Sequence, residues 1–164
     1  MDLSRVNWEN FKKILSKCDE LGMVSRTQRA YTIATAYHET AFTLNPVSEA
    51  FWLKDQDAYL KKHHPEYYPF YGRGFVQLTW DYNYKKYEKI LNIPLFSNPE
   101  LALDPDVAAF ILVHGLITGG FARQNISDHI NDYKIDFFNA RRCVNWLDKA
   151  QQIAIYAIGF IDRV

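Results

Sequence analysis

The segment Tyr67–Tyr84, YYPFYGRGFVQLTWDYNY, sets aromatic rings around a Gly72-Arg73-Gly74 turn. It then carries a run of short hydrogen-bonding side chains at Gln77, Thr79, Asp81 and Asn83. A surface of this kind suits a flat ligand with polar edges, because rings stack on its faces while hydroxyl and amide groups bind its rim. The segment therefore indicates a binding site for a sugar or for a nucleic-acid base.

Bulk composition narrows that choice. The chain has 164 residues, is 48% hydrophobic and 23% charged, and carries 19 basic and 19 acidic residues. A net charge of zero gives no global field to attract phosphate backbones, which argues against a nucleic-acid partner. The length predicts one domain, so residues 1–164 are expected to form a single domain without a separate binding module.

The two cysteines and the N-terminus indicate a cellular location. Cys18 and Cys143 belong to no CxxC pair or Cys/His cluster, so they are predicted to be buried, reduced thiols. Residues 1–21 lack the pattern of a signal peptide, and no apolar run approaches ~18 residues. We expect a monomer without stable membrane association that remains cytoplasmic until it is released from the cell.

Periodicity predicts a mainly α protein. Helices are expected over 7–22, 25–40, 79–91 and 104–120, a short one over 126–133, and closing ones over 136–146 and 148–164. Ser25, Thr79 and Asp104 are the predicted N-caps. A polar and aromatic stretch between Phe42 and Phe75 interrupts the helices, with Gly72 and Gly74 marking a loop or short extended piece.

The candidate general acid is Glu39, at the C-terminal end of the second predicted helix. The helix dipole and apolar neighbours both disfavour a charged carboxylate there and are expected to raise its pKa, as an acid working near neutral pH requires. Taken alone, a solvated glutamate at a helix end is the simpler reading. A zinc protease is excluded because Phe42 stands where the second histidine of that motif belongs, so His38 is an orienting or core histidine. No metal or cofactor is expected.

A glycosidase needs a second carboxylate across the scissile bond. The loop after Glu39 offers Glu49, Asp55, Asp57 and Glu66. Glu49 is preferred because apolar and aromatic residues frame it. Sequence spacing leaves retention or inversion of configuration open.

Two motifs together resemble a known family. YGRGFVQLTWDYNY, Tyr71–Tyr84, is similar to the signature of glycoside hydrolase family 19, the chitinase type, and AYHETA, residues 36–41, resembles the helix end that carries its catalytic acid. NPELALDPDVAAF and ARRCVNWLDKAQQIAIYA resemble compact members from bacteriophage and prophage lysis proteins. The resemblance runs from about Arg26 to the C-terminus.

The resemblance implies a lysozyme-like, two-lobed helical domain with a central substrate cleft. It assigns Glu39 as the acid, Glu49 as the second carboxylate and Thr79 as the residue that helps hold the attacking water. The substrate-binding residues it implies are His38, Trp52, Tyr71, Arg73, Gln77, Tyr82, Asn83 and Asn145, of which Arg73 is also a candidate brace for the cleft. Phe70, Phe75, Trp80 and Tyr84 are expected mostly to pack the core, and Trp52 is either a lid or a core residue.

Two positions depart from the family pattern. Trp146 stands where glycine is usual, which weakens the match at Asn145, and Asp81 stands where asparagine is usual.

Three functions follow as hypotheses. The first is an endolysin that cuts β-1,4 bonds of peptidoglycan by an inverting mechanism. The second is a chitinase acting on β-1,4-linked N-acetylglucosamine. The third is a glycan-binding protein without turnover. Peptidoglycan or a chitin-like polysaccharide is the expected partner in each case.

Overall fold

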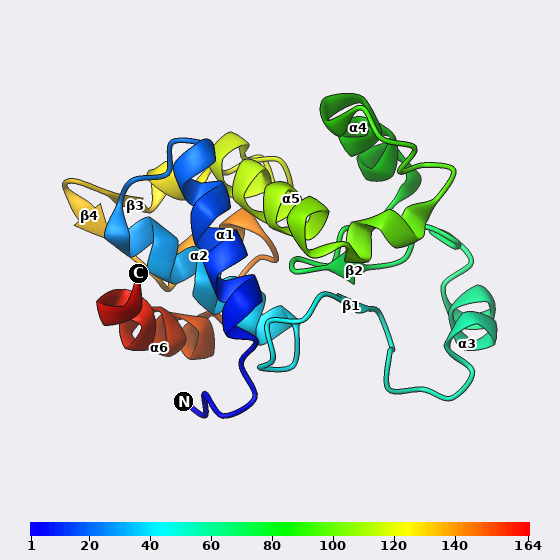
Figure 1. Ribbon diagram of the computed structural model, residues 1–164, viewed down its shortest axis with the longest axis horizontal. Helices are drawn as coiled ribbons and strands as arrows, with labels where there is room; N and C mark the ends of the chain where they lie inside the picture. The colour runs from blue at the N-terminus through cyan, green and yellow to red at the C-terminus, as the bar shows by residue number, and fades with distance from the viewer.

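The computed structural model describes residues 1–164 and is mainly helical, as predicted (Figure 1). The elements are, in order, α1 (Trp8–Glu20), α2 (Arg26–Glu39), β1 (Val47–Ser48), α3 (Gln56–His63), β2 (Arg73–Gly74), α4 (Asp81–Leu91), α5 (Pro105–Thr118), β3 (Ile130–Asn131), β4 (Lys134–Ile135) and α6 (Ala150–Phe160). Short 3-10 helices lie at Pro99–Leu103, Ile126–Asp128, Asn139–Cys143 and Ile161–Arg163.

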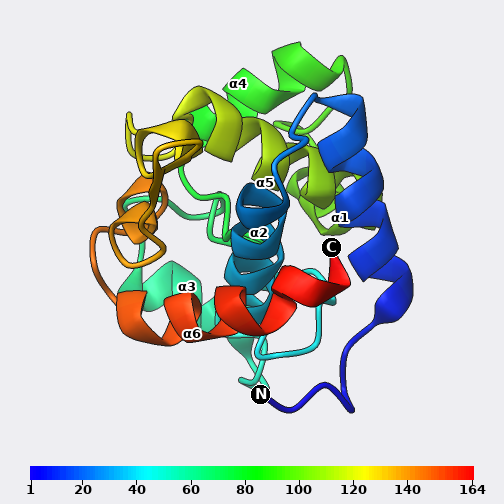
Figure 2. The ribbon, with the colours of Figure 1, turned by 90° about the vertical axis from the view of Figure 1, so that its left-hand side faces the viewer.

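Helix α2 is the centre of the larger lobe, which also contains α1, α5, α6 and the β3–β4 hairpin. Figure 2 shows α2 enclosed by these three helices. The predicted cap Ser25 accepts a hydrogen bond from the backbone N–H of Gln28, and every residue over 30–37 is buried. Alanine and threonine alternate with larger side chains along this stretch, so neighbouring helices approach on all sides. A core of 35 buried residues forms around α2 and extends to buried residues between positions 75 and 95.

Helix α5 begins and ends as its sequence predicts. The Asp104 side chain accepts from the backbone N–H groups of Asp106 and Val107, Pro105 occupies the first turn, and Gly119 ends the helix at φ +69°. Tyr87 of α4 donates its hydroxyl to the carbonyl of Ile111, 3.3 Å away, which ties α4 to α5.

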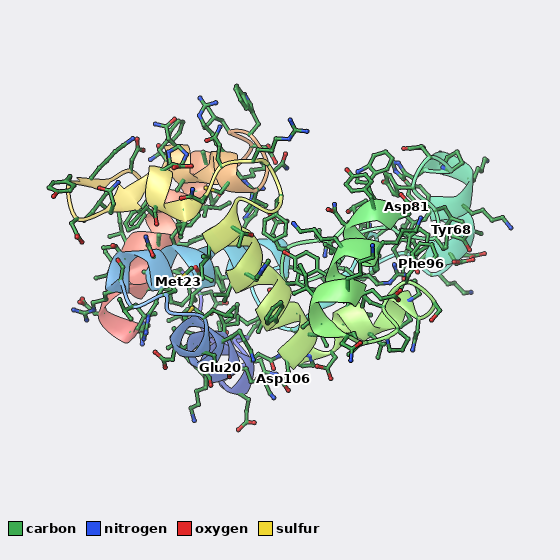
Figure 3. The ribbon with its side chains drawn as sticks, turned by 90° about the horizontal axis from the view of Figure 1, so that it is seen from above. Glu20, Met23, Tyr68, Asp81, Phe96 and Asp106 are labelled. Atoms are coloured by element: carbon green, nitrogen blue, oxygen red, sulfur yellow. The ribbon has the colours of Figure 1, made fainter.

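The smaller lobe comprises residues 47–98, with β1, α3, β2 and α4. Strands β1 and β2 are antiparallel, with Val47 opposite Gly74 and Ser48 opposite Arg73. Beneath α3 lies a separate cluster of only three buried residues, Ala50, Leu60 and Tyr71. Figure 3 separates this lobe, marked by Tyr68, Asp81 and Phe96, from the larger lobe, marked by Glu20 and Met23.

Four local predictions were wrong. The segment 126–133 forms a 3-10 turn and half of the β3–β4 hairpin in place of a helix, and 136–146 holds only the 3-10 helix Asn139–Cys143. Thr79 does not cap α4, because its hydroxyl donates to the carbonyl of Gln77 at 2.9 Å. The stretch predicted as non-helical between Phe42 and Phe75 contains α3.

Both cysteines are free and fully buried in the larger core, as expected. Burial raises the pKa of each thiol to about 12. None of the helices combines the length and the apolar character needed to cross a membrane.

Candidate active site

A cleft of about 400 Å³ lies between the two lobes. Its walls are formed by Glu39, Glu49, Tyr67, Gly72, Val76, Gln77, Thr79, Trp80, Val144 and Asn145. A pocket of about 210 Å³ shares Glu39, Glu49 and Gln77 with it, and another of about 180 Å³ shares Gln77, Thr79 and Val144. The three hollows therefore form one continuous groove.

Glu39 reaches the groove from the larger lobe, at the last residue of α2. Its Oε1 accepts a hydrogen bond from Nη1 of Arg141 at 2.7 Å, while Oε2 has no partner in the protein. The side chain of Arg141 is only 2% exposed, and its Nε donates to the carbonyl of Asp148. The guanidinium therefore fixes one carboxylate oxygen and leaves the other to face the cleft.

Glu49 reaches the groove from the smaller lobe, immediately after β1. Its Oε1 accepts from the hydroxyl of Tyr67 at 2.8 Å, and its Oε2 from the backbone N–H of Gly72 at 3.1 Å. The backbone N–H of Glu49 in turn donates to the Gly72 carbonyl at 2.7 Å. Burial and the bond to Glu49 raise the pKa of Tyr67, so the phenol stays protonated and keeps donating. This arrangement holds the Glu49 carboxylate as a hydrogen-bond acceptor.

Gln77 and Thr79 line the floor between the two carboxylates. Gln77 adopts a left-handed backbone conformation, φ +55°, and its Nε2 donates to the Val47 carbonyl at 2.9 Å. A Cβ at Gly72 would lie 2.7 Å from Oε1 of Gln77, so only glycine leaves room for this side chain. Gly72 thus donates its N–H to Glu49, and because it has no side chain it leaves space for that of Gln77.

Four further predicted residues lie along the groove. Tyr82 and Asn83 line the pocket beyond Thr79, Trp52 lines the pocket beyond Glu49, and Asn145 lines the central part. Trp52 is 73% exposed, which places it at the surface and excludes the core alternative. The Asn83 amide donates to the Thr79 carbonyl at 2.8 Å, which orients the start of α4.

Three predicted substrate-binding residues lie elsewhere, and their assignment is corrected. His38 does not line the groove, and its ring lies 6.3 Å from that of Phe42 and 6.5 Å from that of Tyr156. Tyr71 is 8% exposed and packs beneath α3. These two side chains help build the lobes and do not line the cleft.

Arg73 is the third correction and takes the alternative role of a brace. It is 3% exposed, and its guanidinium lies 3.7 Å from the ring centre of Tyr71. It donates to Glu100 and to the carbonyls of Pro69 and Tyr71. An arginine with this many short contacts fixes the turn that presents Gly72, and it is too deeply buried to reach a ligand.

Sequence reasoning missed three residues of the site. Tyr67 and Trp80 lie in the aromatic segment Tyr67–Tyr84, but the pattern of that segment does not separate rings of the cleft from rings of the core. Trp80, expected mostly in the core, is 38% exposed on the cleft wall with its ring 5.3 Å from that of Tyr67. No local signal pointed to Arg141, because its partner Glu39 lies 102 residues away in sequence.

Chemically, the groove presents two carboxylates from opposite lobes, with a hydroxyl and an amide between them. Such a pair can deliver a proton to one side of a bond and receive one on the other side. No three His, Cys, Asp or Glu side chains converge as a metal site would require.

Comparison with known sequences gives short matches. No protein-family model matches the chain. One endochitinase of Arabidopsis thaliana is 48% identical over 40 residues, covering 24% of this chain and 14% of the relative. A second is 42% identical over 41 residues, covering 25% and 15%. The match thus spans about one seventh of the length of these relatives.

Comparison with solved structures covers nearly the whole chain. Chitinase C from Streptomyces griseus matches with a TM-score of 0.58 at 18% identity, over 98% of this chain and 70% of that one. A bacterial family 19 chitinase matches with a TM-score of 0.55 at 19% identity, over 94% and 87%. At such identities the likeness is one of fold.

Proposed function

Because the chain has the fold of the family 19 chitinases, we propose that it hydrolyses β-1,4 glycosidic bonds of an N-acetylated glycan. The observation that carries the proposal is that Glu39 and Glu49, from different lobes, line one groove. Rings at Trp52, Trp80 and Tyr82 along this groove suit the flat faces of successive sugars.

The two carboxylates take different roles because they are held differently. Glu39 has one free oxygen, Oε2, which would carry the proton to the leaving glycosidic oxygen. Glu49 accepts hydrogen bonds on both oxygens and is suited to act as the base. In the proposed step, water held with the help of Thr79 attacks the anomeric carbon and passes its proton to Glu49, while the bond to the leaving sugar breaks. This single displacement inverts the configuration.

Bacterial peptidoglycan is the proposed substrate, with the protein acting as an endolysin. The groove is open to solvent at both outer pockets, as a long cross-linked polymer requires. Chitin is the second candidate, favoured by the short matches to the two endochitinases.

The test is release of reducing ends from purified peptidoglycan and from chitin oligomers, by the wild-type protein and by Glu39→Gln. We expect cleavage of peptidoglycan by the wild type and loss of it in the variant. Preferred cleavage of chitin would select the second candidate. Binding of either glycan without any release would leave a lectin-like function and contradict the proposal.

The stereochemistry has its own measurement. Proton NMR of the fresh products reports the anomer formed before mutarotation. Inverted product is expected, and retained configuration would assign Glu49 as a nucleophile instead of a base.

A further inference from the structure

Trp146 occupies a backbone conformation that disfavours a large side chain. Its φ is +37°, in the left-handed region where a side chain with a Cβ is strained and glycine is not. Burial does not offset this strain, because the residue is 68% exposed. A bulky ring kept at a strained, exposed position indicates a role at the surface.

Arg142 covers one face of that ring. The centre of its guanidinium lies 4.1 Å from the ring centre of Trp146, and its Nε donates to Oδ1 of Asn139 at 3.2 Å. These two contacts hold the side chain, while Nη1 and Nη2 have no hydrogen-bond partner in the protein. No carboxylate of the chain pairs with Arg142, although Arg73 and Arg141 both have such a partner. A fixed guanidinium with two free nitrogens is suited to bidentate binding of a carboxylate.

The pair lies beside the groove. Val144 and Asn145, the residues between Arg142 and Trp146, line the central cleft, and Val144 also lines the pocket beyond Thr79. Trp146 and Arg142 line none of the three pockets themselves, so a glycan would meet them only where it extends past Asn145.

We propose that Trp146 and Arg142 form an outer subsite that stacks on one sugar and binds a carboxylate carried by the glycan. The inference rests on the proposed glycan substrate and specifies its chemistry, since chitin is uncharged. In peptidoglycan the carboxylate has two alternative sources. They are the peptide attached to the substituted sugar, or the lactyl group of a sugar without its peptide, because an attached peptide converts the lactyl carboxyl into an amide. No lysine, arginine or histidine is among the residues that line the three pockets.

The test measures binding in a Glu39→Gln background, which limits cleavage during the titration. Three ligands are compared by calorimetry: a peptidoglycan tetrasaccharide with its peptides, the same tetrasaccharide after enzymatic removal of the peptides, and chitotetraose. Arg142→Gln is compared with Arg163→Gln, which removes the same charge from the C-terminal 3-10 helix. Trp146→Gly is measured with the same ligands and by thermal unfolding.

We expect Arg142→Gln to weaken binding of a carboxylate-bearing tetrasaccharide about tenfold at low salt, and to leave chitotetraose unaffected. A loss only with peptides attached assigns the peptide carboxylate, and a loss only after their removal assigns the lactyl carboxylate. A loss with both ligands shows that the subsite accepts either carboxylate. Trp146→Gly should weaken all three ligands several-fold without lowering the melting temperature, because it relieves a strained and exposed position.

Equal affinity of parent and Arg142→Gln for all three ligands would overturn the subsite, as would an equal loss for chitotetraose. A lower melting temperature of Trp146→Gly with unchanged binding would make Trp146 structural. The proposed hydrolysis fails separately, if the wild type binds these glycans but cleaves none of them. Absence of any binding by the parent would contradict both.

Discussion

The two carboxylates of the cleft are presented by regions built in different ways. Glu39 ends a 14-residue helix whose middle lies within a core of 35 buried residues. Glu49 follows a two-residue strand, above a cluster of three buried residues, and is fixed by bonds from Tyr67 and Gly72. Hydrophobic packing places the helix that ends at Glu39, whose carboxylate then accepts one bond from Arg141, whereas two hydrogen bonds hold Glu49 on a region with little packing of its own.

This difference predicts how each region fails. Packing energy is spread over many contacts, so damage near α2 should appear mainly as lost stability. A hydrogen bond contributes about 1 kcal/mol, so damage around Glu49 should alter catalysis more than folding.

The largest effect is expected at Glu39. Replacement by glutamine keeps an oxygen that can accept from Arg141 but removes the transferable proton, so kcat should fall about 10²- to 10⁴-fold with little loss of stability. Glu20→Gln is the matched control, because Glu20 ends α1 as Glu39 ends α2 and lies away from the groove. Steady-state hydrolysis with thermal unfolding checks both, and comparable activity of the two variants would remove Glu39 from the mechanism.

A pair of core substitutions tests the contrast between the lobes directly. Ile33 in α2 and Leu60 in α3 are both fully buried. Ile33→Ala should reduce the free energy of unfolding by about 2–5 kcal/mol. Leu60→Ala should cost about 2–3 kcal/mol, since its small cluster relaxes more easily, but should lower kcat more. Urea unfolding and hydrolysis below the transition measure these quantities. If the ratio of activity loss to stability loss is the same in both variants, the proposed difference between the two lobes is wrong.

Tyr67→Phe removes one hydroxyl and preserves the ring contacts with His64 and Trp80. Because Glu49 then loses one of its two donors, kcat/KM should fall about tenfold, equivalent to about 1.4 kcal/mol. Tyr68→Phe deletes the same atom from the neighbouring residue, whose hydroxyl donates to Asp57 outside the groove. A fall of similar size in the two variants would deny Tyr67 a role in positioning Glu49.

The smallest effect is a dependence of stability on pH that arises mainly in the larger lobe. Burial lowers the pKa of His38, His114 and His129 below the usual value of 6.5. As pH falls, the unfolded chain therefore takes up protons before the folded chain does. The stabilisation by neutral histidines is fully present above about pH 6.5 and is lost as pH falls towards the lower pKa values of the folded protein.

Melting temperatures between pH 7.5 and 5 should thus decrease, and His129→Gln should reduce the slope. The exposed His63 of the smaller lobe supplies the control as His63→Gln. An unchanged slope in His129→Gln would remove that residue from the effect.

The larger lobe was the more predictable from sequence. Ser25, Asp104 and Pro105 are local helix signals, and the structure uses each of them as predicted. The segments with 3-10 turns after Gly119 were predicted as helices because their apolar residues have helical spacing over a few positions. Such short runs do not distinguish an α-helix from a 3-10 turn.

The site was predictable where the motif names residues and less so where contacts are distant. Gln77, Thr79, Tyr82 and Asn83 follow from the Tyr67–Tyr84 segment and line the groove. The segment did not predict that Tyr71 turns inward. Inward and outward side chains do not alternate regularly along it, because the backbone is left-handed at Gln77 and Trp80. Arg141 depends on tertiary packing and has no signature near Glu39.

The placement of the two thiols gives the molecule an internal reporter. Cys18 in α1 and Cys143 near α6 both belong to the larger core, and the smaller lobe contains none. A thiol-specific reagent should therefore react only after the larger lobe opens, and the labelling rate would follow that opening alone. Opening of the smaller lobe alone would leave no chemical mark.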